Sequence, residues 1–126
     1  MKKKTILILS ILFLFACKKD LNSEIIGTPK IIGNLKVAEK DFPHVMDWNE
    51  AMSACASLDS GWRLPNKDEL NILYLKADSI GGFKPGDYWS STKSDPLSAF
   101  HQYFFNGYQS GVPMYSLYNV RAVRTK

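Results

Sequence analysis

The sequence feature that most constrains the fold is a change of pattern at Gly81-Gly82. Before this pair, apolar residues recur at helical spacing in two segments, and each segment starts with a capping sequence. After the pair come aromatic-rich segments separated by turn sequences, which is typical of strands. Helices followed by antiparallel strands in one short chain predict the α+β class and argue against a parallel sheet of alternating strands and helices.

Both helices are predicted from their first residues. Asp47 can accept a hydrogen bond from the N–H of Glu50, and Asn66 stands in the same relation to Glu69. Pro65 forces the residue before it into an extended conformation, so the second helix starts after it. The first helix is expected to end before Gly61 and the second at Gly81-Gly82. Their apolar faces are expected to be formed by Trp48, Ala51, Met52, Cys55 and Leu58, and by Leu70, Leu73, Tyr74 and Ala77.

Three segments after Gly82 are predicted to be strands. They are Tyr88–Thr92, Ala99–Phe105 and Tyr118–Arg124. Asn106-Gly107 follows the second of them and is a strong hairpin signal.

The N-terminus has the pattern of a targeting signal. Met1–Lys4 is cationic and Thr5–Phe15 is an apolar run, too short for the roughly 20 residues that span a bilayer. The run ends in Leu14-Phe15-Ala16-Cys17, which resembles a bacterial lipobox. This resemblance implies a signal peptide over 1–16 and fatty acyl chains on Cys17, and it favours the outer membrane because no aspartate follows Cys17. The alternative is an ordinary secretory signal with a coincidental cysteine.

The rest of the chain is expected to be a tether followed by one domain. Residues 17–34 mix polar residues with glycine and proline, so we expect a lipidated tether that includes a docked edge strand, and a folded domain over 35–126. Of the 16 basic residues, three lie at Lys2–Lys4, which leaves 13 against 12 acidic residues. This balance argues against nucleic acid as a partner.

Several blocks in this order resemble a known family. They are Asp47-Trp48-x-Glu50-Ala51, Gly61–Pro65 with Glu69-Leu70, Tyr88–Thr92, and Val120-Arg121-x-Val123-Arg124. Together they resemble the Lcl C-terminal domain family, which is close to the FISUMP-type major paralogous domains of bacterial surface lipoproteins. The resemblance implies a C-type lectin-like fold, with two helices packed on small antiparallel sheets and a long loop region.

The block around Trp62 is interpreted as structural. Trp62 and Leu64 are expected in the core, Pro65 starts the second helix, and Arg63 is expected to pair with Glu50 or Glu69. Trp89 is also expected in the core. Direct ligand contact by the Trp62–Pro65 block is the alternative.

One departure from lectin-like domains concerns a disulfide. Such domains commonly link the first helix to the last strand, but Ala122 occupies the position where Cys55 would find its partner. We therefore expect Cys55 to be a small buried hydrophobic residue, or alternatively an exposed thiol that pairs between molecules.

No pattern of catalytic or metal-binding residues is present in the sequence. His44 and His101 lie far apart and have no cysteine or carboxylate at a zinc spacing. No nucleophile motif, phosphate-binding loop or calcium-lectin motif occurs. We therefore expect no enzyme activity, no metal and no cofactor.

What remains is a binding surface. The segments Lys93–Ser98 and Tyr108–Leu117 are expected to form loops, and their aromatic and amide groups suit a glycan or a flat protein surface. The candidate ligand-binding residues are Lys93, Asp95, Tyr108, Gln109 and Tyr115. Alternatively, the tyrosines pack beneath their own loops. The predicted function is an adhesin-like, non-catalytic binding module anchored to the membrane, and the alternative is a structural accessory subunit of a surface assembly.

Overall fold

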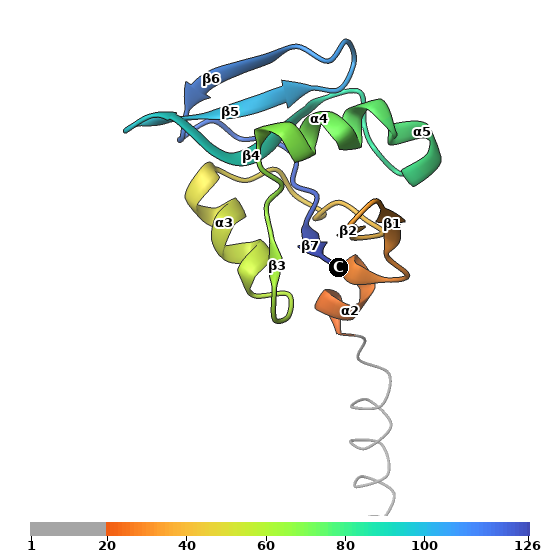
Figure 1. Cartoon of the computed structure of the whole chain (residues 1–126). Coiled ribbons are helices and arrows are strands. Elements are labelled where there is room, and N and C mark those ends of the chain that lie inside the picture. Colours follow the sequence, from red (N-terminus) through yellow and green to blue (C-terminus); the bar gives the residue numbers. More distant parts are fainter. Residues whose placement is uncertain (1–19) are drawn as a thin grey trace, which may run out of the picture.

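The computed structural model describes residues 20–126 (Figure 1). The predicted signal peptide over 1–16 and the predicted lipidation site Cys17 lie outside the described residues. In the described part of the chain, no helix has the length and apolar character needed to cross a membrane.

Four short strands from distant parts of the chain form the first sheet. They are β1 (Lys30–Ile32), β2 (Leu35–Val37), β3 (Trp62–Arg63) and β7 (Val123–Thr125), in the order β1-β2-β7-β3. All neighbours are antiparallel, and Val123 of β7 faces Val37 on one side and Arg63 on the other. The last strand therefore lies inside the sheet and joins the beginning of the domain to its middle.

The second sheet is formed by three strands that follow one another in the chain. They are β4 (Asp87–Asp95), β5 (Ser98–Tyr103) and β6 (Gln109–Pro113), in the order β4-β5-β6. The turn at Asn106-Gly107 joins β5 to β6, and Gly107 adopts φ +86°, a conformation that favours glycine. The predicted hairpin is thus observed.

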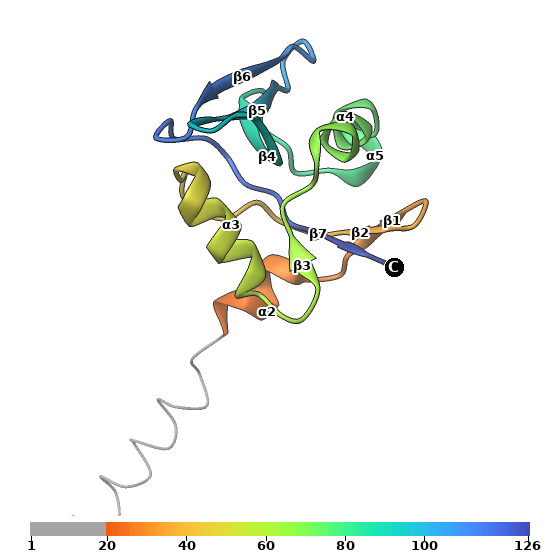
Figure 2. The same ribbon diagram turned by 60° about the vertical axis from the view of Figure 1, so that its left-hand side comes forward.

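The helices are α2 (Leu21–Ile26), α3 (Trp48–Ala56), α4 (Lys67–Leu75) and α5 (Ala77–Ile80). Asp47 caps α3 by accepting from the N–H of Glu50, and Asn66 and Glu69 form a reciprocal capping box on α4. In both views α3 lies beside β3, and α4 lies against β4 and β5 (Figures 1 and 2). The α+β class with two small antiparallel sheets is confirmed.

Two details of the predicted helices are wrong. The second helix ends at Leu75, and a separate turn of helix, α5, continues to Gly81. Met52 is exposed, because it lies on the solvent side of α3 next to the buried Ala51.

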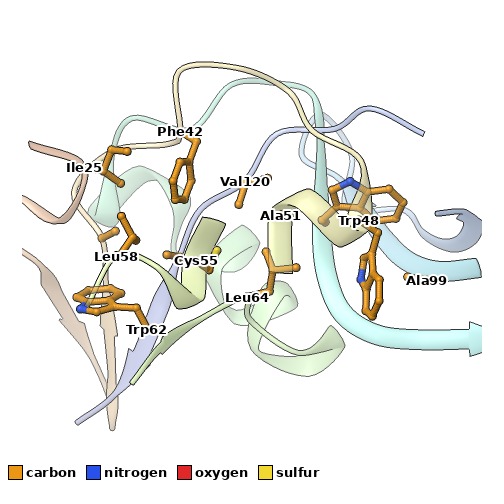
Figure 3. Close-up of a cluster of buried hydrophobic side chains, with 13 residues drawn as sticks. Ile25, Phe42, Trp48, Ala51, Cys55, Leu58, Trp62, Leu64, Ala99 and Val120 are labelled. Atoms are coloured by element: carbon orange, nitrogen blue, oxygen red, sulfur yellow. The ribbon is translucent and has the colours of Figure 1, made fainter. Parts of the chain in front are cut away.

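The core consists of two adjoining clusters. The larger contains Trp62, Leu64 and Trp89, which lie in the core as expected. Figure 3 shows Ile25, Leu58 and Trp62 at one end of this cluster and Trp48 at the other. The smaller cluster packs the β2 and β7 valines against the helices that follow Pro65, and its members are Val37, Leu70, Leu73, Ile80, Tyr88, Phe104 and Val123.

Most of the expected tether belongs to the domain. Asp20 caps α2, and Ile25 on this helix is only 2% exposed because it fills the larger cluster. β1 pairs along its length with β2, which agrees with the expected edge strand. The folded unit therefore begins at about Leu21 rather than at Leu35.

The expected loop segments are also more regular than predicted. Lys93 and Asp95 belong to β4, and Gln109 begins β6, so two of the three strands of the second sheet extend into the expected loops. The final strand is shorter than predicted, because residues 118–122 pair with the segment 38–46 by isolated backbone hydrogen bonds instead of entering a sheet.

Candidate binding groove

A groove of about 530 Å³ opens between the first turn of α3 and the end of the second sheet that contains Leu97, Ser98 and Pro113. Its lining is mostly apolar, with a few polar groups from α3 and β5. The lining residues are Asp47, Asn49, Leu97, Ser98, Pro113, Met114 and Tyr115. A concave, largely apolar surface with a few polar groups is the usual form of a binding site.

Backbone hydrogen bonds hold the walls of this groove together. The N–H of Met114 donates to the carbonyl of Leu97 at 3.1 Å, and the N–H of Trp48 donates to the carbonyl of Met114 at 3.0 Å. The β4–β5 turn, the segment after β6 and the start of α3 are therefore joined without the participation of any side chain that faces the groove.

Two large side chains project from the rim. Tyr115 is 81% exposed and Leu97 is 79% exposed. The turn that presents Leu97 is stabilised by Asp95, whose carboxylate accepts from the N–H of Leu97 at 2.9 Å. Exposed apolar groups gathered at a groove mark a surface for interaction.

Asp47 supplies a negative charge to the groove. Its carboxylate accepts from the N–H of Glu50 at 2.9 Å, and this hydrogen bond keeps the pKa of Asp47 below its ordinary value. Asp47 is thus ionised at neutral pH while it also caps α3.

The five predicted ligand-binding residues do not form one site. Tyr115 lines the groove, and Asp95 shapes its rim. Lys93 lies nearby, with Nζ 5.6 Å from the centre of the Trp48 ring.

Tyr108 and Gln109 lie at the other end of the β5–β6 hairpin. Gln109 pairs with Gln102 and Pro113 pairs with Ser98, so four residues, or about 13 Å of strand, separate the two ends. The Gln109 amide donates to the carbonyl of Lys67 at 2.9 Å and to Gln102 Oε1 at 3.1 Å, so its role is structural.

Leu97 and Met114 lie within the predicted binding segments Lys93–Ser98 and Tyr108–Leu117 but were not named as candidates, whereas Asp47 and Asn49 were missed altogether. Leu97 carried one usable signal, because a large apolar side chain next to Pro96 in a turn has no core to enter. Asp47 and Asn49 are brought to the groove only by the packing of α3 against the second sheet.

A second apolar surface surrounds the β5–β6 turn. Gly107 rests against the Tyr74 ring, and a Cβ at this position would come within 2.6 Å of the ring. Beside it is a hollow of about 310 Å³ lined by Tyr74, Leu75, Ala77, Asp78 and Phe104. The exposed large hydrophobic residues around the turn and on α4 are Ile72, Leu75, Phe105 and Tyr108.

Three polar residues of the second sheet lie in a line. His101 Nε2 is 2.8 Å from Ser110 Oγ, and His101 Nδ1 is 2.9 Å from Asp87 Oδ1. However, Nδ1 makes no hydrogen bond of acceptable geometry, and neither cavity described above is lined by Ser110. Because a serine nucleophile needs an oriented histidine and space for a substrate, we assign this line no catalytic role.

His44 and His101 do not lie together in a group that could bind a metal ion. His44 is exposed before α3, whereas His101 is buried and stacks on Tyr118 with ring centres 5.0 Å apart. Within residues 20–126, no three potential metal ligands are grouped closely enough to hold a metal ion.

Arg63 forms the predicted ion pair with Glu69. Two hydrogen bonds of 2.7 and 2.9 Å join the guanidinium to the two carboxylate oxygens, and the same pairing lowers the pKa of Glu69. Arg63 also donates to Thr125 Oγ1 at 3.0 Å, so it links α4 to β7.

Arg121 forms a buried ion pair that the sequence did not indicate. Its Nε donates to Asp41 Oδ1 at 2.7 Å, and its Nη1 donates to the carbonyls of Ala38 and Gly81. Tyr88 donates its hydroxyl to the other Asp41 oxygen, and burial raises the pKa of Tyr88. Through Arg121, these contacts join the C-terminal segment to the loop that contains Ala38 and Asp41 and to Gly81 at the end of α5.

Cys55 is fully buried in the larger cluster, and so is Ala122. Cys55 was expected to be either a small buried hydrophobic residue or an exposed thiol, and the structure supports the first interpretation. Burial raises the pKa of the Cys55 thiol to about 12.

Comparisons with known proteins agree with this fold. Botrocetin matches with a TM-score of 0.59 at 12% identity, covering 79% of this chain and 98% of that one. Botrocetin in its complex with a mutant von Willebrand factor A1 domain matches with a TM-score of 0.55 at 12% identity, over 79% and 98% of the two chains. EMS16, an antagonist of a collagen receptor integrin, matches with a TM-score of 0.59 at 11% identity, over 78% and 97%.

A search of curated proteins found no match. The model of the Lcl C-terminal domain, however, matches residues 22–124, which is nearly the whole described chain. The match begins within α2, in agreement with the boundary observed in the fold. The chain therefore belongs to the Lcl C-terminal domain family.

Proposed function

We propose that this protein is a lipid-anchored binding module of the bacterial cell envelope, held at the outer membrane by acyl chains on Cys17 and possessing no enzyme activity. The lipobox-like sequence before Cys17 supports the anchor. Several acyl chains, at about 0.8 kcal/mol per buried methylene, are enough for stable membrane attachment.

The observation that carries the binding role is the groove between α3 and the second sheet. Its exposed Tyr115 and Leu97 are large side chains on a backbone that hydrogen bonds hold in place. Rigid aromatic anchors in such surroundings contribute most of the energy at protein interfaces. The apolar lining favours a protein segment as ligand, and the stacking face of Tyr115 next to Asn49 and Ser98 also suits a glycan.

The structural neighbours support a protein ligand. Botrocetin is seen with the von Willebrand factor A1 domain, and EMS16 acts on a collagen receptor integrin. Both share with this chain the fold on which the groove is built.

The test is to measure binding of the purified protein to arrays of glycans and sulfated polysaccharides, with calcium and with chelator, and to cross-link it to envelope proteins. Replacing a hot-spot residue of an interface costs about 2 kcal/mol or more of binding energy. We therefore expect Tyr115→Ala to weaken binding at least tenfold without lowering the melting temperature.

Tyr108→Ala is the matched control, since Tyr108 is also exposed but lies at the opposite end of the hairpin. Equal binding by Tyr115→Ala and the unchanged protein would contradict the groove as the ligand site. A ligand bound only in the presence of calcium would instead require a metal site that the groove does not explain.

The second apolar surface favours another role, that of an accessory subunit in a surface assembly. Phe105 and Tyr108 would then contact a fixed protein partner. In that case the protein co-purifies with one partner, and Tyr108→Ala rather than Tyr115→Ala releases it.

A further inference from the structure

The first helix of the domain, α2, is rigidly attached to the core. Ile25 is buried, and Asn22 Nδ2 donates to the carbonyl of Ser57 at 3.1 Å. The N–H groups of Glu39 and Lys40 donate to the carbonyls of Ile26 and Ile25 at 3.0 and 3.2 Å. These contacts leave no hinge between α2 and the remainder of the domain.

Only three peptide links separate Cys17 from Asp20, the capping residue of α2. Fully extended, they span about 11 Å. A domain of this size has a radius of gyration of about 13 Å. A lipid on Cys17 would therefore hold the domain on a link shorter than its own radius, and the domain could not turn freely above the bilayer.

The side of the first sheet that carries α2 has a composition suited to a lipid surface. Ile31 pairs with Lys36, Lys36 pairs with Arg124, and Arg124 pairs with Trp62, so these four side chains lie on one face of the sheet. Trp62 packs in the same cluster as Ile25 of α2, which places the row on the α2 side.

This face combines apolar and basic groups, and of the two acidic residues at α2, Asp20 caps the helix and Glu24 pairs with Lys40. Ile31 is 48% exposed, and Leu21 of α2 is 54% exposed. Within residues 20–126, neither Lys36 nor Arg124 forms an ion pair. The Lys36 ammonium and the Arg124 guanidinium are therefore available to pair with an external anion. Basic groups beside exposed apolar side chains are what a membrane surface with anionic headgroups attracts.

We propose that the α2 side of the β1-β2-β7-β3 sheet lies on the bilayer, with Lys36 and Arg124 at lipid phosphates and Leu21 and Ile31 at the headgroup boundary. This inference rests on the proposed anchor at Cys17. In both views the β4–β5–β6 sheet lies at the opposite end of the molecule from α2 (Figures 1 and 2). In this orientation the second sheet, and with it the binding groove, lies at the end of the domain remote from the membrane.

The test uses the chain from Cys17 onward, which contains every described element, coupled through Cys17 to a maleimide lipid in nanodiscs. Cys55 is buried and does not compete for the maleimide. Nanodiscs of phosphatidylcholine and phosphatidylglycerol also contain a lipid with a nitroxide on its headgroup, and the broadening of each amide signal by NMR reports its distance from the headgroups.

We expect the amide signals of residues 21–36 and 124–126 to be broadened at least twofold more than those of residues 97–115. Lys36→Glu with Arg124→Glu is expected to reduce this difference, whereas Lys84→Glu with Lys93→Glu, at exposed positions outside the proposed contact face, leaves it unchanged. Uniform broadening, or the strongest broadening at residues 97–115, would overturn the proposed orientation.

The two proposals fail separately. The maleimide supplies the anchor chemically, so the orientation is measured whether or not the cell acylates Cys17. The mass of the protein purified from bacterial membranes tests acylation by itself.

Discussion

At the scale of single residues, the stability of the core depends on how the buried charge of Arg121 is neutralised. Its side chain is inaccessible to solvent, and within residues 20–126 its only ion-pair partner is Asp41, 80 positions earlier in the chain. A buried ion that loses its partner typically costs 3–5 kcal/mol, because the remaining charge has neither solvent nor counterion.

We therefore expect Asp41→Asn to lower the free energy of unfolding by about 3–5 kcal/mol in urea titrations. The double variant Asp41→Leu with Arg121→Met should lose less than the sum of the two single changes, since it leaves no unpaired charge. Lys84→Ala, at an exposed position, is the control. A loss below about 1 kcal/mol for Asp41→Asn would contradict the importance of this pair.

A second prediction at this scale concerns Cys55. Because burial raises its thiol pKa to about 12, almost no thiolate forms near neutral pH. In a Cys17→Ser variant, a thiol reagent such as DTNB should react with Cys55 at least about 100-fold more slowly in buffer than in concentrated urea. Rapid reaction of the folded protein would show that Cys55 is accessible after all.

At the scale of helices and strands, the junction of β3 and α4 depends on Glu69. This carboxylate takes part in the capping box and receives two hydrogen bonds from Arg63, whose pairing holds the pKa of Glu69 below its ordinary value of 4.5. A group with a lowered pKa in the folded state stabilises the fold above its unfolded-state pKa and loses this effect as the pH falls through its folded-state pKa.

The stability difference between the unchanged protein and Glu69→Gln should thus be constant near neutral pH and shrink below about pH 4.5. Urea titrations across this range measure it. Asp68→Asn, in the same turn but without these partners, is the matched control and should not reproduce the trend. A difference that stays constant down to acid pH would exclude the ion pair as its source.

The individual helices and strands also show which parts of the fold could be predicted from the sequence and which could not. The two longer helices were predictable, because Asp47 and Asn66 are strong caps and apolar residues follow at helical spacing. The six residues of α2 are too few to establish a period, so Asp20 alone marked that helix. The pairing of Arg121 with Asp41 joins segments far apart in the chain, and no local pattern carries that information.

The candidate site was predictable only in part for the same reason. Tyr115 is exposed and aromatic in a turn-rich segment, which is a local signal. Tyr108 gives the same local signal, yet the register of β5 and β6 carries it to the opposite end of the hairpin. Which tyrosine joins the groove thus depends on strand pairing rather than on composition.

At the scale of the whole molecule, the N-terminal segment closes the domain. α2 and β1 contribute the buried Ile25 and one edge of the first sheet. A chain that starts at Leu35 should lose at least about 2–5 kcal/mol of unfolding free energy, as expected when a buried isoleucine is removed. A chain that starts at Asp20 should match the longer protein in the same titration. Equal stability of the chains that start at Leu35 and at Asp20 would mean that α2 does not contribute to the core.

The backbone hydrogen bonds that join Leu97, Met114 and Trp48 also have an evolutionary consequence. Because these hydrogen bonds do not involve the side chains of Leu97, Pro113 or Tyr115, mutations at positions 97, 113 and 115 change the surface chemistry of the groove with little effect on foldability. These positions can therefore vary in sequence while the scaffold stays constant. The same three positions are the natural choice for randomisation in a display library built on this domain.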